Sequence, residues 1–550
     1  MATNGLRKER LSIYLARPDV EEFSSLLRPE AEAQSHAIEV AGFSDARLYI
    51  RNSAGNALPT WTNLFTSNGV VPARAFVPPR SVGALLVLKN ASNIFAITFG
   101  VGYHLLNTEA VVRDFGVRVV LGSVDSKKLR SLDKASYEQN PLNSRVQSTT
   151  EVGVFDLEMD TESEMLYAVV GVSRERLFGE RIAGRDALVL VTDADLDGFS
   201  QIVAHAVAKY NSGLPNQFAW FNNIRRVIST QEHQRLDRQL NELLSANNFS
   251  LLWLGEPEIV DWETHVGYSF DLMPRTPRHA VLTIDKLREY AQSKGIPLTV
   301  ESLREISVHV NDHEYKSVRE WSAYRCLYAE ITSGGCTFIL RNGVWFRVDR
   351  DFSNSLNEYI DDIPSYAIDL PVCEHRAEKD YNASVARNRN DMHLMDRSLV
   401  YTDGRHGPIE FCDILANQSD IIHVKFYTGS ATLSHLFYQG QVSAQLFIED
   451  ANFRASLNPK LPATWRLPDT DIRPSPANYR VVFGIATNKA IPQELPFFAK
   501  ITLRNAVKAL LALGYSVSLA RIPLGTSLLA QQNIRPRKPR RRRASRDSRT

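Results

Sequence analysis

The chain has 550 residues, of which 44% are apolar and 23% are charged, an ordinary composition for a globular protein. No stretch holds the roughly 18 consecutive apolar residues that a membrane helix needs, and the first twenty residues lack the apolar core of a secretory signal. The four cysteines form no CxxC pair, which argues against a disulfide framework or a zinc finger. We therefore expect a cytoplasmic protein with no membrane contact.

Charge is distributed unevenly along the chain. The net charge is +2, and residues 535–550 carry nine Lys or Arg and one Asp. The rest of the chain is therefore mildly acidic. Such a tail is either a solubilising, disordered arm or a contact for the phosphates of nucleic acid, and we weigh the two equally. The candidate phosphate contacts are Arg537, Lys538, Arg540, Arg541, Arg542 and Arg543.

The first two thirds of the chain predict strands more often than helices. Residues 1–150 read as a β-rich module, with a hairpin formed by "VGALLVLKN" and "IFAITFGVG" and a long exposed connection at 126–150. Residues 151–300 read as a mixed α/β region, with an amphipathic helix in 231–248. Residues 301–370 predict a β-meander whose turns include Gly334-Gly335 and Asn342-Gly343.

Residues 371–530 show a regular alternation of elements. A polar helix at 373–390 precedes three strands at 392–402, 409–415 and 421–427. A helix at 430–450, a strand at 479–487, a helix at 495–514 and a strand at 515–522 follow. We expect the second and third strands to be antiparallel neighbours, and residues 531–550 to be a disordered basic tail. The fold class is α+β and multidomain, with a C-terminal α/β domain of αβββαβ order.

Two of these strands contain ionisable residues: Glu410 and Asp413 in one, His423 and Lys425 in the other. Burying a charge is costly unless it is paired or binds a metal, so the pattern predicts a functional site. With these residues, the order of elements resembles the core of the PD-(D/E)xK nuclease superfamily. There, an acid on the second core strand and an acid-x-Lys on the third meet at one sheet edge.

The resemblance implies a role for each residue. Asp413 matches the second-strand acid, and His423-Val424-Lys425 matches the acid-x-Lys. The acids would hold Mg²⁺ or Mn²⁺, and the lysine would position or activate water. Since a histidine stands in place of the usual acid, Glu410 is a candidate for the missing carboxylate, although a three-residue spacing puts it on the opposite face of a flat strand. The implied metal ligands are Asp413, His423 and Glu410.

Two further polar residues match positions that some members of the superfamily add. Glu378 lies in the preceding predicted helix, and Gln439 lies in the following one. The same fold without catalysis, and an unrelated fold with a cross-strand charge pair, remain open alternatives at this point.

A second resemblance covers more of the chain. Phrases such as "FAITFGVGYHLLN", "IEFCDIL" and "HVKFY" are similar to a sporadically distributed bacterial family of unassigned function, found near restriction-modification and defence genes. Together the resemblances imply a metal-dependent nuclease that cleaves DNA or RNA in anti-phage defence. The alternative is a non-catalytic sensor that binds nucleic acid or a partner protein. Either could act as a homo-oligomer or with a defence-system partner.

Overall fold

The structure is a computed structural model that describes residues 8–526 and 528. Residues 30, 55–71, 73–79, 137–142, 163, 194–195, 258–259, 261–264, 274–275 and 401–408 lie outside the description. The chain forms two compact units, one of residues 1–136 and 142–222, the other of 137–141 and 223–550. Each unit combines helices with mainly antiparallel sheets, which confirms a mixed α/β, multidomain protein; the finer division into five segments remains a prediction.

The N-terminal unit is built on one sheet of order β2-β3-β4-β5-β1-β10-β9-β8-β6-β7, antiparallel at every described pairing. Its core includes Leu11, Phe95, Phe115 and Phe178, all fully buried. The elements are β1 (Lys8–Leu15), β2 (Gln34–Ala37), β3 (Asp45–Ala54), β4 (Arg80–Lys89), β5 (Ile94–Gly100), β6 (Val124–Ser136), β7 (Asn143–Val152), β8 (Glu164–Ser173), β9 (Arg181–Gly184), β10 (Leu188–Asp193), α2 (Phe115–Leu121) and α3 (Phe199–Asn211). The predicted hairpin is confirmed as β4 and β5.

The exposed connection predicted at 126–150 is wrong. The segment forms β6 and β7, which pair with each other. Leu129 and Leu132 are buried between charged neighbours, and Asp133 is neutralised by Arg145 across the hairpin at 2.6 Å. Because cross-strand partners satisfy these charges, a polar sequence can form the last two strands of the sheet.

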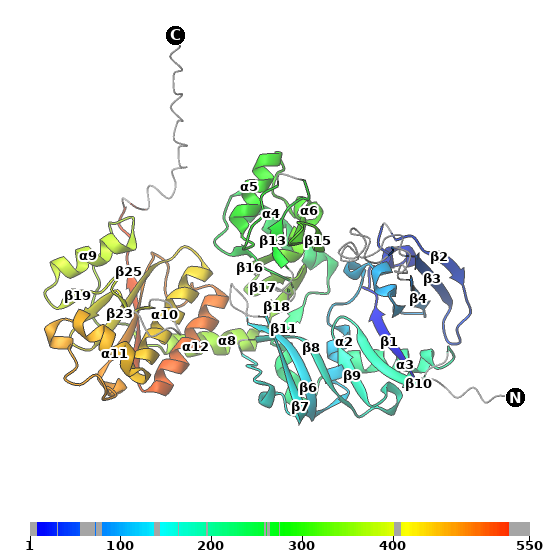
Figure 1. The fold of residues 1–550 in the computed structure, drawn as a ribbon, viewed down its shortest axis with the longest axis horizontal. Coiled ribbons are helices and arrows are strands. Elements are labelled where there is room, and N and C mark those ends of the chain that lie inside the picture. Colours follow the sequence, from blue (N-terminus) through cyan, green and yellow to red (C-terminus); the bar gives the residue numbers. More distant parts are fainter. Residues whose placement is uncertain are drawn as a thin grey trace, which may run out of the picture. The chain divides into compact units, whose positions relative to one another are not determined.

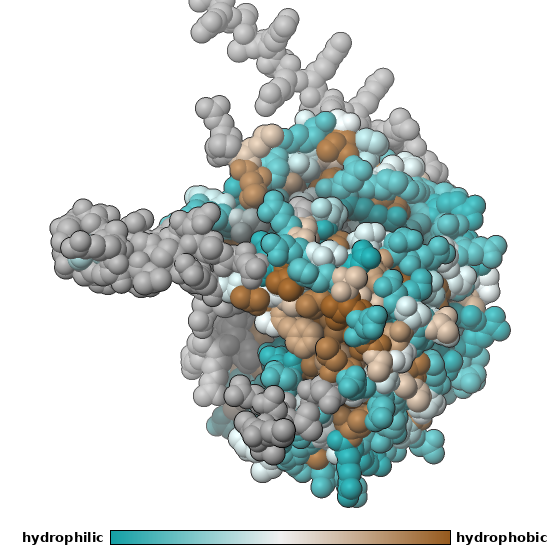
Figure 2. All heavy atoms as spheres, turned by 90° about the vertical axis from the view of Figure 1, so that its right-hand side faces the viewer, coloured by the Kyte–Doolittle hydropathy of each residue, from teal (hydrophilic) through white to brown (hydrophobic). Residues whose placement is uncertain are grey.

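One face of the molecule carries a patch of apolar side chains surrounded by hydrophilic residues (Figure 2). Exposed large apolar side chains of the N-terminal unit include Val82, Tyr103 and Phe155. Single exposed apolar residues are common on protein surfaces, whereas the apolar side chains in this view lie next to one another (Figure 2).

The second unit begins with two small antiparallel sheets that share one apolar core. The predicted meander is divided between them, because α7 interrupts it. The core includes Leu236, Leu240 and Leu244 from one face of α4, the amphipathic helix predicted from sequence. The elements are β11 (Ile224–Arg226), α4 (Thr230–Ser245), β12 (Leu252–Leu254), β13 (His265–Ser269), α5 (Ile284–Lys294), α6 (Val300–Glu305), β14 (Ser307–Asp312), β15 (Ser317–Ser322), α7 (Ala323–Cys326), β16 (Leu327–Ser333), β17 (Cys336–Arg341), β18 (Val344–Val348) and α8 (Arg350–Asp361).

The unit ends in a mixed sheet of order β19-β22-β23-β24-β25, with β23, β24 and β25 parallel (Figure 1). Helix α9 packs on one face, where Tyr381 and Val385 join a core with Ile422 and Val424. Helices α10 and α12 pack together, and α10 lies on β23 and β24. The elements are α9 (Glu378–Asn388), β19 (Met392–Leu394), β20 (Leu399–Val400), β21 (Ile409–Glu410), β22 (Ile414–Ala416), β23 (Asp420–Phe426), α10 (Ser430–Glu449), α11 (Ala451–Leu457), β24 (Arg480–Ala486), α12 (Phe497–Leu513) and β25 (Ser516–Ile522).

The predicted antiparallel pairing of the two strands that carry ionisable residues is confirmed. Strands β22 and β23 are antiparallel, with Ile414 opposite Ile422, and β24 joins the same sheet. Two predicted strands are interrupted, however. Residues 392–402 contribute β19 and β20, and residues 409–415 contribute β21 and β22; β20 and β21 form a separate two-stranded ribbon. These interruptions determine the geometry of the candidate site.

Candidate metal site

Asp413 is held at the point where the chain enters β22. Its backbone N–H donates to the Ile422 carbonyl at 3.0 Å, and its Oδ2 accepts the N–H of Val424 at 2.7 Å. Only 9% of the residue is exposed. A carboxylate that accepts a backbone N–H of the neighbouring strand is fixed in orientation, so Asp413 is a rigid member of the site.

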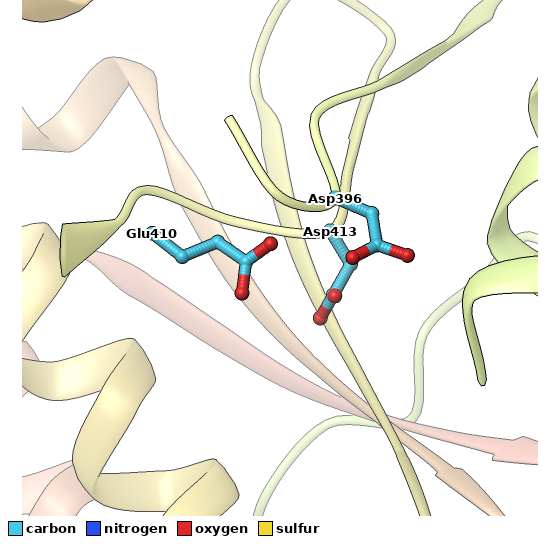
Figure 3. A group of neighbouring side chains, drawn as sticks. All are labelled: Asp396, Glu410 and Asp413. Atoms are coloured by element: carbon cyan, nitrogen blue, oxygen red, sulfur yellow. The ribbon is translucent and has the colours of Figure 1, made fainter. Parts of the chain in front are cut away.

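Two more carboxylates converge on Asp413. The backbone N–H groups of Met395 and Asp396 both donate to the Asp413 carbonyl, at 2.8 and 3.0 Å, which places Asp396 against it. Oxygens of Asp396, Glu410 and Asp413 all lie within 4.8 Å of one another, and Figure 3 shows the three side chains pointing toward one another. The alternation argument that put Glu410 on the opposite face is wrong, because the break between β21 and β22 lets the chain turn.

Electrostatics at the cluster are unfavourable for ionised carboxylates. The pKa of Asp413 is raised to about 8, mainly by burial and also by the nearby Glu410, Asp396 and Glu378, against the Val424 N–H, which lowers it. Burial also raises the pKa of Glu410, with a contribution from Asp396. Like charges crowded together with little solvent favour a bound cation or a proton.

Asn382 of α9 joins the cluster from the opposite side. It is fully buried, and its Nδ2 lies 3.3 Å from Asp413 Oδ1 and 3.4 Å from Asp396 Oδ2. Its Oδ1 has no hydrogen-bond partner among the described residues. Buried polar atoms are nearly always satisfied, so this oxygen, beside the carboxylates, is an acceptor that lacks its usual partner in the described part of the chain. Three carboxylates and an amide oxygen form the donor set that Mg²⁺ and Mn²⁺ prefer.

Lys425 lies beside the cluster at the carboxyl end of β23. Its Nζ donates to Glu378 Oε2 at 2.7 Å, and the N–H of Phe426 donates to Glu378 Oε1 at 3.0 Å. Glu378 opens α9, four residues before Asn382, so one helix face supplies both contacts. The structure thus brings Glu378, Asn382, Asp413 and Lys425 together.

Glu410 is positioned from two sides. Its Oε1 accepts the backbone N–H of Arg397, a residue with a φ of 63°. Left-handed backbone is unfavourable for arginine, and such strain often occurs at functional sites. Its Oε2 lies 3.3 Å from Gln439 Nε2 of α10, so Gln439 contacts the cluster as its helical position suggested.

His423 is not a member of the carboxylate cluster. It is fully buried, and its Nε2 lies 3.5 Å from Ser443 Oγ of α10. Its ring also packs near Phe483, and an added Cβ at Gly440 would lie 3.2 Å from its Cδ2. Burial lowers the pKa of His423 to about 3, so the imidazole is neutral. Asp396, rather than His423, completes the carboxylate set.

The six basic residues predicted to contact phosphates, 537–543, lie outside the described residues. No helix in the described part of the chain is long and apolar enough to span a membrane.

The fold and the cluster define a multidomain, mixed α/β protein with a candidate divalent-metal site in its C-terminal sheet. Residues 11–523 match a family of unknown function, DUF6119, and the chain belongs to this family. No curated protein and no solved structure shows significant similarity to the chain.

Proposed function

We propose that the protein is a metal-dependent nuclease that hydrolyses phosphodiester bonds of DNA or RNA. The observation that carries the proposal is the convergence of Asp396, Glu410 and Asp413 within 4.8 Å, beside Lys425 and Glu378. Carboxylates suit a divalent metal that activates water, and a lysine on the adjacent strand suits the negative charge of a phosphate, so the two together fit phosphodiester hydrolysis. The proposed cellular role is defence against foreign genetic elements, as the resemblance to a defence-associated family implies.

Each residue has a proposed task. Asp396, Glu410 and Asp413 would hold Mg²⁺ or Mn²⁺, with Asn382 Oδ1 as a further oxygen donor. When bound, the ion supplies Lewis-acid chemistry that lowers the pKa of water and neutralises negative charge on phosphate. Lys425 adds a positive charge next to the reacting phosphate. Glu378 holds the Lys425 ammonium in place and can accept a proton from water.

The test combines metal binding with cleavage. Purified protein should bind Mn²⁺ in isothermal titration and cleave single-stranded or duplex oligonucleotides with Mg²⁺ or Mn²⁺. Asp413→Asn and Glu410→Gln should weaken Mn²⁺ binding and lower the cleavage rate by about 10²–10³-fold, since each removes a charged contact to the reacting centre. Lys425→Ala should lower the rate while Mn²⁺ binding is retained.

Asp420→Asn is the matched control. Asp420 is another buried carboxylate on β23, at the opposite end of the strand, where it accepts the Tyr366 hydroxyl and an Asn417 N–H, both at 2.9 Å. Cleavage per folded molecule should survive this change. If Mn²⁺ binds to the wild-type protein and not to Asp413→Asn, but no substrate is cleaved, the metal site is supported and the non-catalytic sensor becomes the preferred function. Binding that is unchanged in Asp413→Asn refutes the site.

A further inference from the structure

Tyr427 lies directly beyond the proposed hydrolysis centre. It follows β23 two residues after Lys425, and its N–H donates to the Ala486 carbonyl at 3.1 Å, so the extended pairing with β24 continues to this residue. Two residues of a strand span about 7 Å and return to the same face. The Tyr427 ring is therefore about 7 Å along the strand from the lysine that would face the reacting phosphate.

Lys489 is fixed on this ring. Its Nζ lies 4.5 Å from the ring centroid and 3.2 Å from the Tyr427 hydroxyl. Its backbone N–H donates to Thr487 Oγ1 at 3.1 Å, which orders the turn after β24. A cation over an aromatic face is attracted by the ring quadrupole, so the ammonium is held next to the sheet edge.

Beyond their contact with each other, the two residues are free of strong charge or ring partners among the described residues. In the described part of the chain, no carboxylate lies within ion-pair distance of the Lys489 ammonium and no aromatic ring stacks on Tyr427. The lysine side chain is exposed and the tyrosine is half-buried. Proteins bind single-stranded nucleic acid through aromatic rings, on which bases stack, and through cations, which contact phosphates. Tyr427 and Lys489 provide one of each side by side.

The surrounding charge supports the same assignment. Four carboxylates, Asp396, Glu410, Asp413 and Glu378, lie at the centre, and Lys425 is paired with one of them. Such a centre repels a polyanion unless cations at its edge attract it. Lys489 is a cation in a position to do so.

We propose that Tyr427 and Lys489 position the substrate and that the substrate is single-stranded nucleic acid. An unpaired base stacks on the face of the Tyr427 ring opposite the Lys489 ammonium, and Lys489 contacts a neighbouring phosphate. A paired base within a duplex cannot present its face to the ring, so intact duplex is bound less tightly. The inference rests on the proposed function, because it takes the reacting phosphate to lie near Asp413 and Lys425.

The experiment measures binding without cleavage. Full-length Asp413→Asn protein is titrated without divalent metal against fluorescein-labelled oligo(dT) and against a duplex of equal length, by fluorescence anisotropy. In this background, Tyr427→Ala should weaken oligo(dT) binding about tenfold and leave duplex binding unchanged. Tyr427→Phe should restore binding. Lys489→Gln should reduce the salt slope for oligo(dT) by about 0.7.

Tyr438→Ala is the matched control, because Tyr438 of α10 is 63% exposed and takes no part in the Tyr427–Lys489 pair; its loss should not change the difference between single strands and duplex. Melting temperatures identify variants that do not fold. If Tyr427→Ala does not fold, Lys489→Gln still tests the proposal, because it changes only an exposed side chain. Equal losses for single strands and duplex, or unchanged oligo(dT) binding in Tyr427→Ala or Lys489→Gln, overturn the proposal. Tyrosine-dependent binding by a protein that cleaves nothing supports it while refuting the nuclease.

Discussion

Glu330 gives the stability of the second unit a defined pH dependence. Its carboxylate on β16 is buried and caps the N-terminus of α12, accepting the N–H of Phe497 at 2.6 Å and that of Phe498 at 3.3 Å. Burial raises the pKa of Glu330 to about 7, although these two N–H groups and the distant ammonium groups of Lys500 and Lys489 lower it. The desolvation of the carboxylate is therefore only partly offset by its hydrogen bonds.

The sign and size follow from linkage. The folded pKa lies above the unfolded value of 4.5, so between pH 4.5 and 7 the native state keeps a proton that the unfolded chain has released. The free energy of unfolding is then highest below about pH 4.5 and falls as pH rises to about 7. Each unit of pKa difference corresponds to about 1.4 kcal/mol, so the titration of Glu330 lowers the free energy of unfolding by about 3 kcal/mol across this window.

Glu330→Gln isolates this contribution. Glutamine keeps a carbonyl oxygen for the Phe497 N–H but does not titrate. Urea unfolding can be followed by intrinsic tryptophan fluorescence, to which Trp253 contributes; its ring lies 5.5 Å from that of Phe498. Between pH 5 and pH 8 the free energy of unfolding should fall by about 2.5 kcal/mol more in the wild-type protein than in the variant. Parallel pH profiles for the two proteins would refute the reasoning.

Three further predictions concern other parts of the chain. Gly440→Ala should destabilise the protein by about 1–3 kcal/mol, because a Cβ there would lie 2.5 Å from Phe483 Cε1; an unchanged melting temperature contradicts this. His423→Glu should destabilise the fold by at least about 2 kcal/mol, since it buries an unpaired carboxylate, while His423→Gln is mild; equal melting curves for the two variants would show that the pocket admits charge. Deleting 535–550 should flatten the salt dependence of nucleic-acid binding, and an unchanged slope would show that the tail makes no phosphate contact.

The regular elements of the C-terminal domain could be predicted because their apolar residues follow clear periods. Among these elements, the run that became β24 is almost wholly apolar, as a strand covered on both faces must be. Glu378 and Gln439 were assigned to helices that indeed reach the site. The resemblance to a known arrangement of elements thus directed attention to the segment in which Asp396, Glu410 and Asp413 converge.

The details of the site could not be predicted because they depend on where strands break. Asp396 was placed inside a continuous strand, yet Met395 and Asp396 leave the sheet to bond the Asp413 carbonyl. The left-handed Arg397 marks this break, and the polar run Asp-Arg-Ser was its only signal in the sequence. His423 was misassigned because a histidine within a strand indicates either a ligand or a neutral core residue, and only its neighbours decide which.

Gly440 has a consequence for the evolution of this family. With no side chain, it lets α10 approach β24 so closely that a methyl group would collide with Phe483, and the next residue back, Gln439, reaches Glu410 from that position. A larger residue at 440 would lift the helix and withdraw Gln439 from the carboxylate. Relatives that have replaced this glycine should therefore carry smaller residues at positions 423 or 483, or should have lost the glutamine as well. Correlated substitutions at these positions would reveal the close packing of α10 on β24 from sequences alone.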